Sequence, residues 1–451
     1  MSLEEEILAE IKPTREEVEK TLRIAEALLG RLADEARREG IPGKPLLVGS
    51  VAKGTYLKHP EIDAFFAFPP ETSREDLERW GLRLGRVLDN PTLRYAEHPY
   101  TRGVFQGLEA DVVPCYELDR PSARMTAVDR TPFHYVYVRD RMSGPQKDQV
   151  RLLKRFMKGI GTYGAEARVQ GFSGYLCELL VLRYGAFRPV LEETARWRPP
   201  IRLELEGESQ KPLDEPLVFV DPVDADRNAA SAVSAHALAT FILAAKGYGE
   251  QPDRRFFFPE PVRPLSQTAL RKELRGRGTS LIGITAAAPE LPEDVIYPQL
   301  RKTEQAVRAF LREKEFRVLR SQPFLLEKEW VLLLELVTGE LPLVRKHFGP
   351  PTSLDHAEAF LAKWEGSPQR VAGPYIEGDR LVVDVRREEP KASRALEKQM
   401  GALSLGKNLD RAVKGGFRVL AGDAIARAGY RTPLTEFLGP GLPWRVTKSR
   451  R

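Results

Sequence analysis

Apolar residues near the N-terminus recur every three or four positions, which is the spacing of a buried helix face. Thr14 and Glu17 precede this stretch with the spacing of a capping box, and Gly40 follows it. We therefore predict one long helix that begins after Thr14 and ends before Gly40. The positions expected on its buried face are Val18, Leu22, Ala25, Leu29, Leu32 and Ala36.

The next hundred or so residues contain short apolar runs, which are typical of strands rather than helices. Ser73 stands where a helix cap is expected, between the second and third of these runs. We predict that residues 1–145 form a domain built on a small mixed sheet with helices. Its strands are expected over residues 46–48, 61–68, 93–98, 102–106 and 108–113.

From residue 146 the helical period returns. Val150, Leu153, Phe156 and Met157 form an apolar stripe, and the flanking positions are basic. Further helices are predicted over residues 175–184 and 228–246, with a strand over 217–220. The pattern favours a central, mainly helical domain over residues 146–260.

Beyond residue 260 the pattern changes again to strands that alternate with helices. The order is a strand (280–285), a helix (294–314), two strands (316–321 and 330–337), a helix (354–364) and a strand (380–385). This β-α-β-β-α-β order predicts a ferredoxin-like layer, a scaffold that does not by itself specify a function. About 60 further residues are expected to form a basic helical tail, which completes a C-terminal domain over 261–451. The fold class is therefore α+β, with several domains.

Composition narrows the class of protein only slightly. A chain of 451 residues is expected to form roughly two to four domains, and its net charge of +6 is compatible with a polyanionic partner. It has two cysteines and no apolar run of about 18 residues, so neither a disulfide framework nor a membrane span is expected. The acidic N-terminus is unlike a signal peptide, and we expect a cytoplasmic protein.

Gly49 and Ser50 end the first predicted strand, and Lys53 follows shortly after. A glycine permits close approach of the backbone to a phosphate, while a hydroxyl and an ammonium bind phosphate oxygens. The alternative is an ordinary turn. The GxxxxGK[ST] order of a P-loop is absent, because Lys53 precedes Gly54.

Three carboxylates stand close to predicted strand ends. Glu61 and Asp63 are two positions apart, so their side chains share one face, and Asp111 lies within a later apolar run. Magnesium prefers such hard oxygen ligands, and carboxylates shared by two metal ions activate a hydroxyl and stabilise a leaving pyrophosphate. Taken singly, each is equally compatible with a solvated or structural carboxylate. The three together predict a magnesium site.

These motifs and the longer strings around them resemble the archaeal, class I CCA-adding enzymes, which belong to the polymerase-β-type nucleotidyltransferase superfamily. The resemblance extends beyond Gly49-Ser50, Glu61-x-Asp63 and Asp111 and covers nearly the whole chain in order. After about residue 260 fewer residues match, although the order of elements agrees. The strings that carry it are 95–100 (YAEHPY), 109–116 (EADVVPCY), 128–134 (VDRTPFH), 150–154 (VRLLK), 163–166 (YGAE) and 171–180 (GFSGYLCELL).

The resemblance implies a fold, a reaction and a role for individual residues. It implies a polymerase-β-like first domain that adds C, C and A to the 3′ end of tRNA from CTP and ATP, with the C-terminal half on the acceptor and T arms. Glu61, Asp63 and Asp111 would bind Mg²⁺ as catalytic residues. The nucleotide-binding residues would be Gly49, Ser50, Lys53, His134, Lys154, Tyr163 and, at the edge of the base, Arg227. Homodimers are known in the family.

Two departures and two other functions stay open at this point. The family often has arginine where Lys53 stands and a larger aliphatic residue where Ala64 stands. Lysine lacks the bidentate phosphate contact of arginine. A poly(A) or oligoadenylate polymerase would use the same carboxylates, and an RNA-binding protein with a decayed transferase centre would share the fold. Without the resemblance, Lys154, Tyr163, His134 and Arg227 are equally compatible with structural or surface roles.

Overall fold

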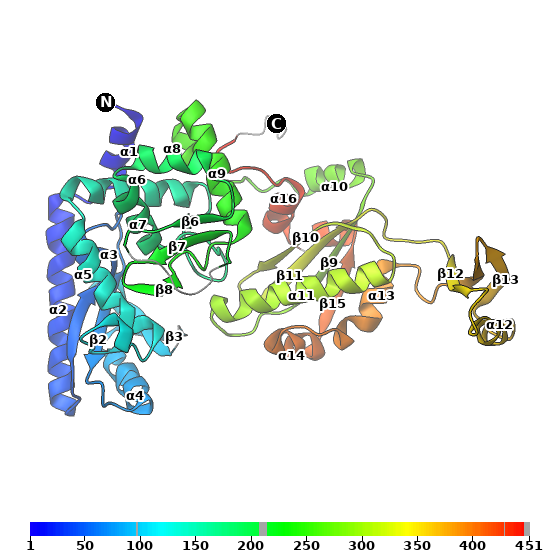
Figure 1. The fold of residues 1–451 in the computed structure, drawn as a ribbon, viewed down its shortest axis with the longest axis horizontal. Helices are drawn as coiled ribbons and strands as arrows, with labels where there is room; N and C mark the ends of the chain where they lie inside the picture. Colours follow the sequence, from blue (N-terminus) through cyan, green and yellow to red (C-terminus); the bar gives the residue numbers. More distant parts are fainter. Residues whose placement is uncertain (96–97, 207–213, 428, 446–451) are drawn as a thin grey trace. The chain divides into compact units, whose positions relative to one another are not determined.

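The computed structural model describes residues 1–95, 98–206, 214–427 and 429–445. The chain divides into two compact units (Figure 1). The first comprises Met1–Glu260 together with the residues from Gly441 onward, and the second comprises Pro261–Pro440. Within the described ranges, no helix is long and apolar enough to cross a membrane.

The first unit begins with a five-stranded sheet in the order β1-β2-β5-β4-β3. Its strands are β1 (Lys44–Val48), β2 (Ile62–Phe68), β3 (Asp89–Tyr95), β4 (Pro99–Phe105) and β5 (Leu108–Tyr116). Strands β2 and β5 are parallel and central, and all but one residue of β2 is buried. Each predicted strand is present. Residues 96 and 97 of the third prediction lie outside the described residues.

Helices α1 (Leu3–Ile11), α2 (Arg15–Glu39) and α4 (Arg74–Leu84) belong to the same unit, and α2 packs on β1 and β2 (Figure 1). The predicted caps are present: Thr14 and Glu17 form the capping box, and Ser73 caps α4. The predicted buried face of α2 was partly wrong, because Leu22 is exposed. The buried side is turned by one position and comprises Thr21, Ile24, Ala25, Leu28, Leu32 and Ala36.

The remainder of the first unit is mainly helical, as expected, but it also contains a small sheet. The helices are α5 (Thr131–Arg141), α6 (Gly144–Gly159), α7 (Gly174–Tyr184), α8 (Phe187–Arg196) and α9 (Ala235–Glu250). The sheet has the order β6-β7-β8, with β6 (Ile201–Leu203), β7 (Leu217–Asp221) and β8 (Asp224–Asn228). The predicted helix over 228–246 therefore starts seven residues late, because Asp224–Asn228 pairs with β7 and Ser234 caps α9.

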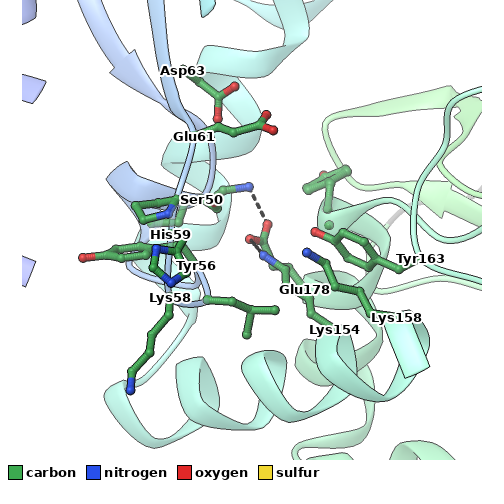
Figure 2. Close-up of a pocket in the computed structure, with 16 residues that line it drawn as sticks. Ser50, Tyr56, Lys58, His59, Glu61, Asp63, Lys154, Lys158, Tyr163 and Glu178 are labelled. Atoms are coloured by element: carbon green, nitrogen blue, oxygen red, sulfur yellow. Dashed lines mark hydrogen bonds and ion pairs between the residues drawn. The ribbon is translucent and has the colours of Figure 1, made fainter. Parts of the chain in front are cut away.

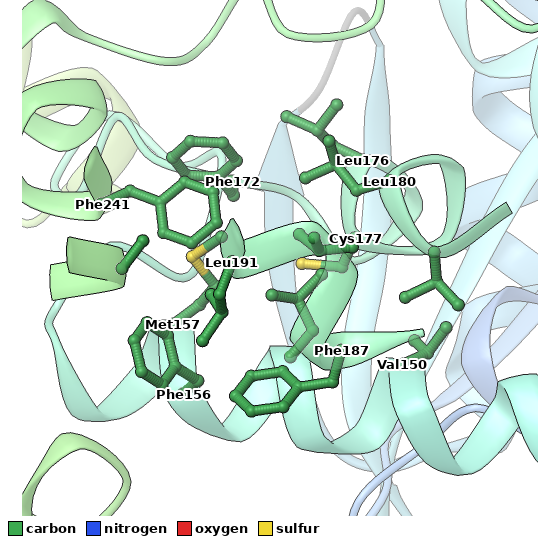
Figure 3. Close-up of a cluster of buried hydrophobic side chains, with 14 of the residues drawn as sticks. Val150, Phe156, Met157, Phe172, Leu176, Cys177, Leu180, Phe187, Leu191 and Phe241 are labelled. Carbon is green, nitrogen blue, oxygen red and sulfur yellow. The ribbon is translucent and has the colours of Figure 1, made fainter. Parts of the chain in front are cut away.

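The core of this part lies where α6, α7, α8 and α9 meet (Figure 3). Phe156 of α6 lies against the rings of Phe187 and Phe241, and Cys177 of α7 is fully buried. The apolar stripe predicted on α6 is this buried face. It holds the helix rigidly, so that the opposite side presents its basic residues at fixed positions.

The second unit contains the predicted ferredoxin-like layer, but two of its segments were assigned wrongly. The sheet order is β10-β11-β9-β15, from β9 (Ser280–Ala287), β10 (Val318–Leu325), β11 (Glu329–Leu336) and β15 (Phe417–Ala421). Its helices include α11 (Glu293–Glu313), α13 (Ala392–Gln399) and α14 (Lys407–Gly415). The fourth strand thus comes from the stretch expected to be helical, and it pairs with β9.

The segments predicted as the last helix (354–364) and strand (380–385) are indeed a helix and a strand, but they belong to a separate small sheet and not to the ferredoxin-like layer. The small sheet has the order β12-β14-β13, with β12 (Val344–Pro351), β13 (Arg370–Glu377), β14 (Arg380–Arg386) and helix α12 (Ala357–Glu365). Trp364 of α12 packs on Val383 and Val385, which are therefore unavailable to the larger sheet. Helices α10 (Gln267–Gly276), α15 (Asp423–Arg427) and α16 (Arg431–Leu438) complete the second unit.

The chain returns to the first unit after Pro440, which the prediction of one C-terminal domain over 261–451 did not anticipate. Trp444 is buried and stacks on Phe256, with ring centroids 5.5 Å apart. This aromatic contact places Trp444 in the core of the first unit. The basic end over 448–451 lies outside the described residues.

Candidate active site

A cavity of about 350 Å³ opens in the first unit, between the end of the large sheet and helices α6 and α7. Figure 2 shows Glu61 and Asp63 together at one end of it, with Lys154, Lys158 and Tyr163 on the opposite wall. Of the residues predicted from the sequence, it is lined by Gly49, Ser50, Lys53, Glu61, Asp63, Lys154 and Tyr163.

Gly49 begins the short helix α3 (Gly49–Lys53), which replaces the predicted loop at the end of β1. Its backbone φ of +68° is a left-handed conformation that residues with a side chain rarely adopt. A Cβ atom at this position would lie 1.7 Å from Oδ2 of Asp63. Glycine is therefore required here for two reasons, and the reason that concerns function is the space it leaves for the Asp63 carboxylate.

Asp63 and Asp111 lie directly beside each other in the parallel pairing of β2 with β5. Glu61 precedes β2, two residues from Asp63. Burial, and then the negative charges of Asp111 and Glu61, raise the pKa of Asp63 to about 7. Burial is also the main cause of the raised pKa of Glu61. The sheet thus concentrates negative charge at one point, as the sequence pattern predicted.

Arg102 of β4 partly neutralises this charge, and nothing in the sequence pattern singled it out. Its Nε donates to Oδ1 of Asp111 at 2.7 Å, and its Nη2 donates to Oδ2 at 2.8 Å. The same Nη2 donates to Oε2 of Glu61 at 3.1 Å. Both oxygens of Asp111 are thereby occupied.

The carboxylate oxygens of Glu61, Asp63 and Asp111 are the type of ligand that a divalent cation prefers. Within the described part of the chain, no three acidic, histidine or cysteine side chains converge as ready-made ligands of one ion. Arg102 supplies one positive charge to the three carboxylates, through its ion pairs with Asp111 and Glu61. Burial is the largest cause of the raised pKa of Asp63, and the negative charges of Asp111 and Glu61 add to it. Three carboxylates with unbalanced charge fit a hard cation such as Mg²⁺.

Two lysines of the cavity, Lys53 and Lys154, share one buried counter-ion, Glu178 of α7. Lys53 forms an ion pair with Glu178, Thr55 Oγ1 donates to Glu178 Oε1 at 2.6 Å, and Lys154 Nζ lies 3.5 Å from the same oxygen. Glu178 is 1% exposed. Burial lowers the pKa of Lys154. Helices α3, α6 and α7 are thus joined at the wall of the cavity, and the ammonium of Lys53 is held there.

His134 and Arg227 lie outside the cavity lining and meet at another buried carboxylate, that of Asp221. His134 Nε2 is 2.9 Å from Oδ2 of Asp221, and Arg227 Nη1 donates to the same oxygen at 2.6 Å. Tyr175, which lines the cavity, donates to Oδ1 of Asp221 and stacks on the His134 ring at 4.0 Å. Burial lowers the pKa of His134, whereas the neighbouring Asp221 carboxylate opposes this shift.

Comparison with protein families assigns each part of the chain. Residues 29–134 match the nucleotidyltransferase domain, and residues 148–258 match the second domain of tRNA nucleotidyltransferases. Residues 277–422 match the C-terminal domain of CCA-adding enzymes. The CCA-adding enzyme of Methanosarcina barkeri is 39% identical over 428 residues, covering 93% of this chain and 94% of that protein. This chain belongs to the family of archaeal CCA-adding enzymes.

A second family member, the CCA-adding enzyme of Methanothermobacter thermautotrophicus, is 40% identical and covers 98% of both chains. A structure of the Cid1 poly(U) polymerase shares 13% identity and a TM-score of 0.43, covering 55% of this chain and 92% of that one. That score is too low to support a shared substrate. The nucleotidyltransferase superfamily generally uses divalent metal ions.

Sequence reasoning missed four polar residues of this region: Arg102, Lys158, Glu178 and Asp221. Lys158 lines the cavity, and its ammonium lies 5.1 Å from the centre of the Tyr163 ring. Glu178 had a usable signal, because a charged residue in the otherwise apolar run 176–181 requires a buried partner. Arg102 had none, since its partnership with Asp111 depends on the register between β4 and β5.

Proposed function

We propose that Glu61, Asp63 and Asp111 form the reacting centre of a template-independent tRNA nucleotidyltransferase. The enzyme adds C, C and A to the 3′ end of tRNA from CTP and ATP and releases pyrophosphate. Membership of the CCA-adding enzyme family supports the reaction. One structural observation carries the site assignment, namely that Asp63 and Asp111 lie side by side, with Asp63 at a cavity walled by basic side chains.

In the proposed step, the 3′-hydroxyl oxygen of tRNA bonds to the α-phosphorus of the nucleotide, and the bond from that phosphorus to the bridging oxygen of the β-phosphate breaks. The hydroxyl proton passes to the carboxylate of Asp111. Mg²⁺, when bound by Glu61, Asp63 and Asp111, supplies positive charge that favours the ionised hydroxyl and stabilises the pyrophosphate. The cavity excludes water and holds the reacting groups in line, so positioning supplies much of the rate.

The triphosphate is assigned to the basic wall. Lys53 and Lys154 point into the cavity region beside Glu178, and Ser50 with the backbone of α3 lies at its floor. Tyr163 closes one side. His134 and Arg227 are assigned to the base, with Asp221 as the carboxylate that orients both. This arrangement accounts for lysine at position 53, because a buried partner fixes its ammonium where arginine would use two donors.

Transfer RNA is the acceptor substrate, and residues 261–440 are proposed to bind its acceptor and T arms through phosphates and A-form shape. Cytoplasmic location follows from this substrate and belongs to the proposal. So does a homodimer, which sedimentation analysis of the purified protein would test. Residues 1–145 would hold the metal ions and residues 146–260 the nucleotide.

The decisive variant is Asp63→Asn, which keeps the shape of the side chain and removes its charge. We expect loss of CTP incorporation into tRNA that lacks CCA, with tRNA affinity nearly unchanged. Asp76→Asn is the matched control, since Asp76 forms a surface ion pair with Arg79 on α4 and should leave incorporation unchanged. Full incorporation by Asp63→Asn would contradict the metal-ligand assignment.

The products distinguish the proposed reaction from homopolymer synthesis. The protein is incubated with tRNA that lacks CCA and with CTP, ATP or both. We expect two C residues with CTP alone and a finished CCA end with both nucleotides. Long tails of a single nucleotide would identify a poly(A)-type polymerase instead.

A further inference from the structure

Arg102 occupies the carboxylates that the proposed function assigns to the metal ion. In the antiparallel pairing of β4 with β5, Arg102 lies directly opposite Asp111. Its guanidinium forms two parallel hydrogen bonds to Asp111, at 2.7 and 2.8 Å, and a third to Glu61 at 3.1 Å. A single side chain therefore contacts two of the three acidic residues.

This contact is made from a neighbouring position on the same rigid sheet, so it requires no loop closure or partner chain. The two side chains differ in exposure: that of Asp111 is 10% exposed, whereas that of Arg102 is 32% exposed. The guanidinium thus has a route to solvent, while Asp111 stays at the site. The bidentate geometry is the one in which arginine binds a carboxylate most strongly.

We propose that Arg102 is a built-in competitor of the divalent cation: it holds Asp111 and Glu61 when the cation is absent and releases both when the cation binds. The proposal rests on the assignment of these carboxylates to the metal. Each oxygen of Asp111 accepts one hydrogen bond from Arg102, and the positive charge of the guanidinium repels a cation at the same carboxylate, so Arg102 and the cation compete for Asp111. The apparent cation affinity is then the intrinsic affinity reduced by the fraction of molecules in which Asp111 is free.

Arg102 also supports the fold while no cation is present. Glu61, Asp63 and Asp111 meet on one side of the sheet, where like charges oppose folding. The guanidinium supplies one positive charge to this cluster. Replacing it should therefore have two opposite effects, namely tighter cation binding and a less stable cation-free protein.

The experiment measures binding of Mn²⁺ to the full chain without nucleotide or tRNA, from the electron paramagnetic resonance signal of free Mn²⁺. Arg102→Gln should bind Mn²⁺ about tenfold more tightly than the wild type, because the competing ion pair is gone. In EDTA the melting temperature of Arg102→Gln should be lower than that of the wild type. Adding Mn²⁺ should raise the melting temperature of the variant by more than that of the wild type. Arg102→Lys keeps one charge without the bidentate contact and should tighten binding by about threefold.

Arg255→Gln is the matched control. Arg255 makes the same bidentate contact with Asp253, at 2.8 and 2.7 Å, but away from the cavity lining. It should leave Mn²⁺ affinity unchanged. Mn²⁺ binding by Arg102→Gln that is equal to or weaker than that of the wild type would overturn the competitor role. If the glutamine variant does not fold, the same comparison is made with Arg102→Lys.

The failure of the metal assignment itself has a different signature. If wild type and Asp63→Asn bind Mn²⁺ equally well, the carboxylates are not the metal site and the proposed function fails at that point. If Asp63→Asn loses a site that Arg102→Gln leaves at wild-type affinity, only the role of Arg102 fails.

Discussion

At the scale of single residues, the Asp63 carboxylate fills the space that a side chain on residue 49 would need. Because a Cβ atom on residue 49 would lie 1.7 Å from the Asp63 carboxylate, any side chain there must displace that carboxylate or the end of β1. The left-handed φ of Gly49 adds a backbone cost of about 1–3 kcal/mol for other residues. The position therefore couples the geometry of the backbone directly to the position of a proposed metal ligand.

We predict that Gly49→Ala reduces CTP incorporation by at least about 100-fold, since a displacement of about 1 Å has that effect on well-positioned groups. Gly30→Ala is the control, because Gly30 lies within α2 with no atom within 4 Å of its added Cβ. It should raise the free energy of unfolding by about 0.5–1 kcal/mol and leave incorporation unchanged. Primer extension on CCA-less tRNA and urea unfolding measure the two effects, and wild-type incorporation by Gly49→Ala would contradict the role given to Gly49.

The raised pKa of Asp63 predicts how stability depends on pH when no cation is bound. Its pKa is about 7 in the folded protein, against an ordinary value of 3.8 for an aspartate in an unfolded chain. Between these values the folded state binds more protons, so this residue makes the free energy of unfolding fall as pH rises from about 4 to about 7.

Asp63→Asn removes this dependence. In EDTA we expect the variant to be a few kcal/mol more stable than the wild type at pH 8 and to lose more than half of that advantage at pH 5. Urea unfolding at the two pH values measures the difference. An advantage that is the same at both pH values would show that the ionisation of Asp63 is not its cause.

The local sequence pattern singled out the three carboxylates, because they are unusual for their setting, whereas Lys154, Tyr163, His134 and Arg227 were assigned only through the resemblance to the CCA-adding enzymes. An aspartate in an apolar strand requires a partner. Arg102 escaped because its role depends on which strands pair. Asp221 escaped because His134 and Tyr175 reach it from helices that are distant in the sequence. Long-range register is a property of the assembled sheet.

At the level of elements, Glu178 joins three helices that come from distant parts of the first unit. Lys53 is on α3, Lys154 is on α6 and Glu178 is on α7. All three side chains are buried, so removing the one negative charge leaves two ammonium groups without a counter-ion. Such a loss destabilises a protein more than the intact network stabilises it.

We therefore expect Glu178→Gln to lower the free energy of unfolding by about 3–5 kcal/mol at pH 7. Glu193→Gln removes the carboxylate of a surface ion pair with Arg196 and should change the free energy of unfolding by no more than about 0.5 kcal/mol. Thermal and urea unfolding decide the comparison. Equal stability of the two variants would mean that the lysines are neutral or solvated in the folded protein.

Whether an element could be predicted from the sequence depended on how local its signals are. Capped, periodic helices such as α2 and α4 were located within a residue, because their signals are local. Strand β15 was missed because it is five residues long, only partly buried and paired on one side alone, with β9. The small sheet β12-β14-β13 and helix α12 are inserted between β11 and α13 of the ferredoxin-like layer. Because α12 and β14 have apolar residues of their own, the sequence pattern assigned them to that layer as its last helix and strand.

For the whole molecule, the two units have separate hydrophobic cores, and every residue of the cavity lies in the first unit. Leu332 of β11 is buried in the core of the second. We predict that Leu332→Ala lowers the stability of that unit by about 2–5 kcal/mol and weakens tRNA binding, while Mn²⁺ and CTP binding stay at wild-type affinity. Limited proteolysis and titration measure these effects, and a loss of CTP affinity would contradict the independence of the site.

The stacking of Trp444 on Phe256 has a consequence for synthesis of the protein. A ribosome makes residues 261–440 before it reaches Trp444, so the core of the first unit is completed only after the second unit has been made. A chain released before residue 441 would leave one face of the Phe256 ring without its partner. The unit that contains the cavity therefore depends on a residue made after the other unit, and a chain without Trp444 would be less stable in the part that carries out the chemistry.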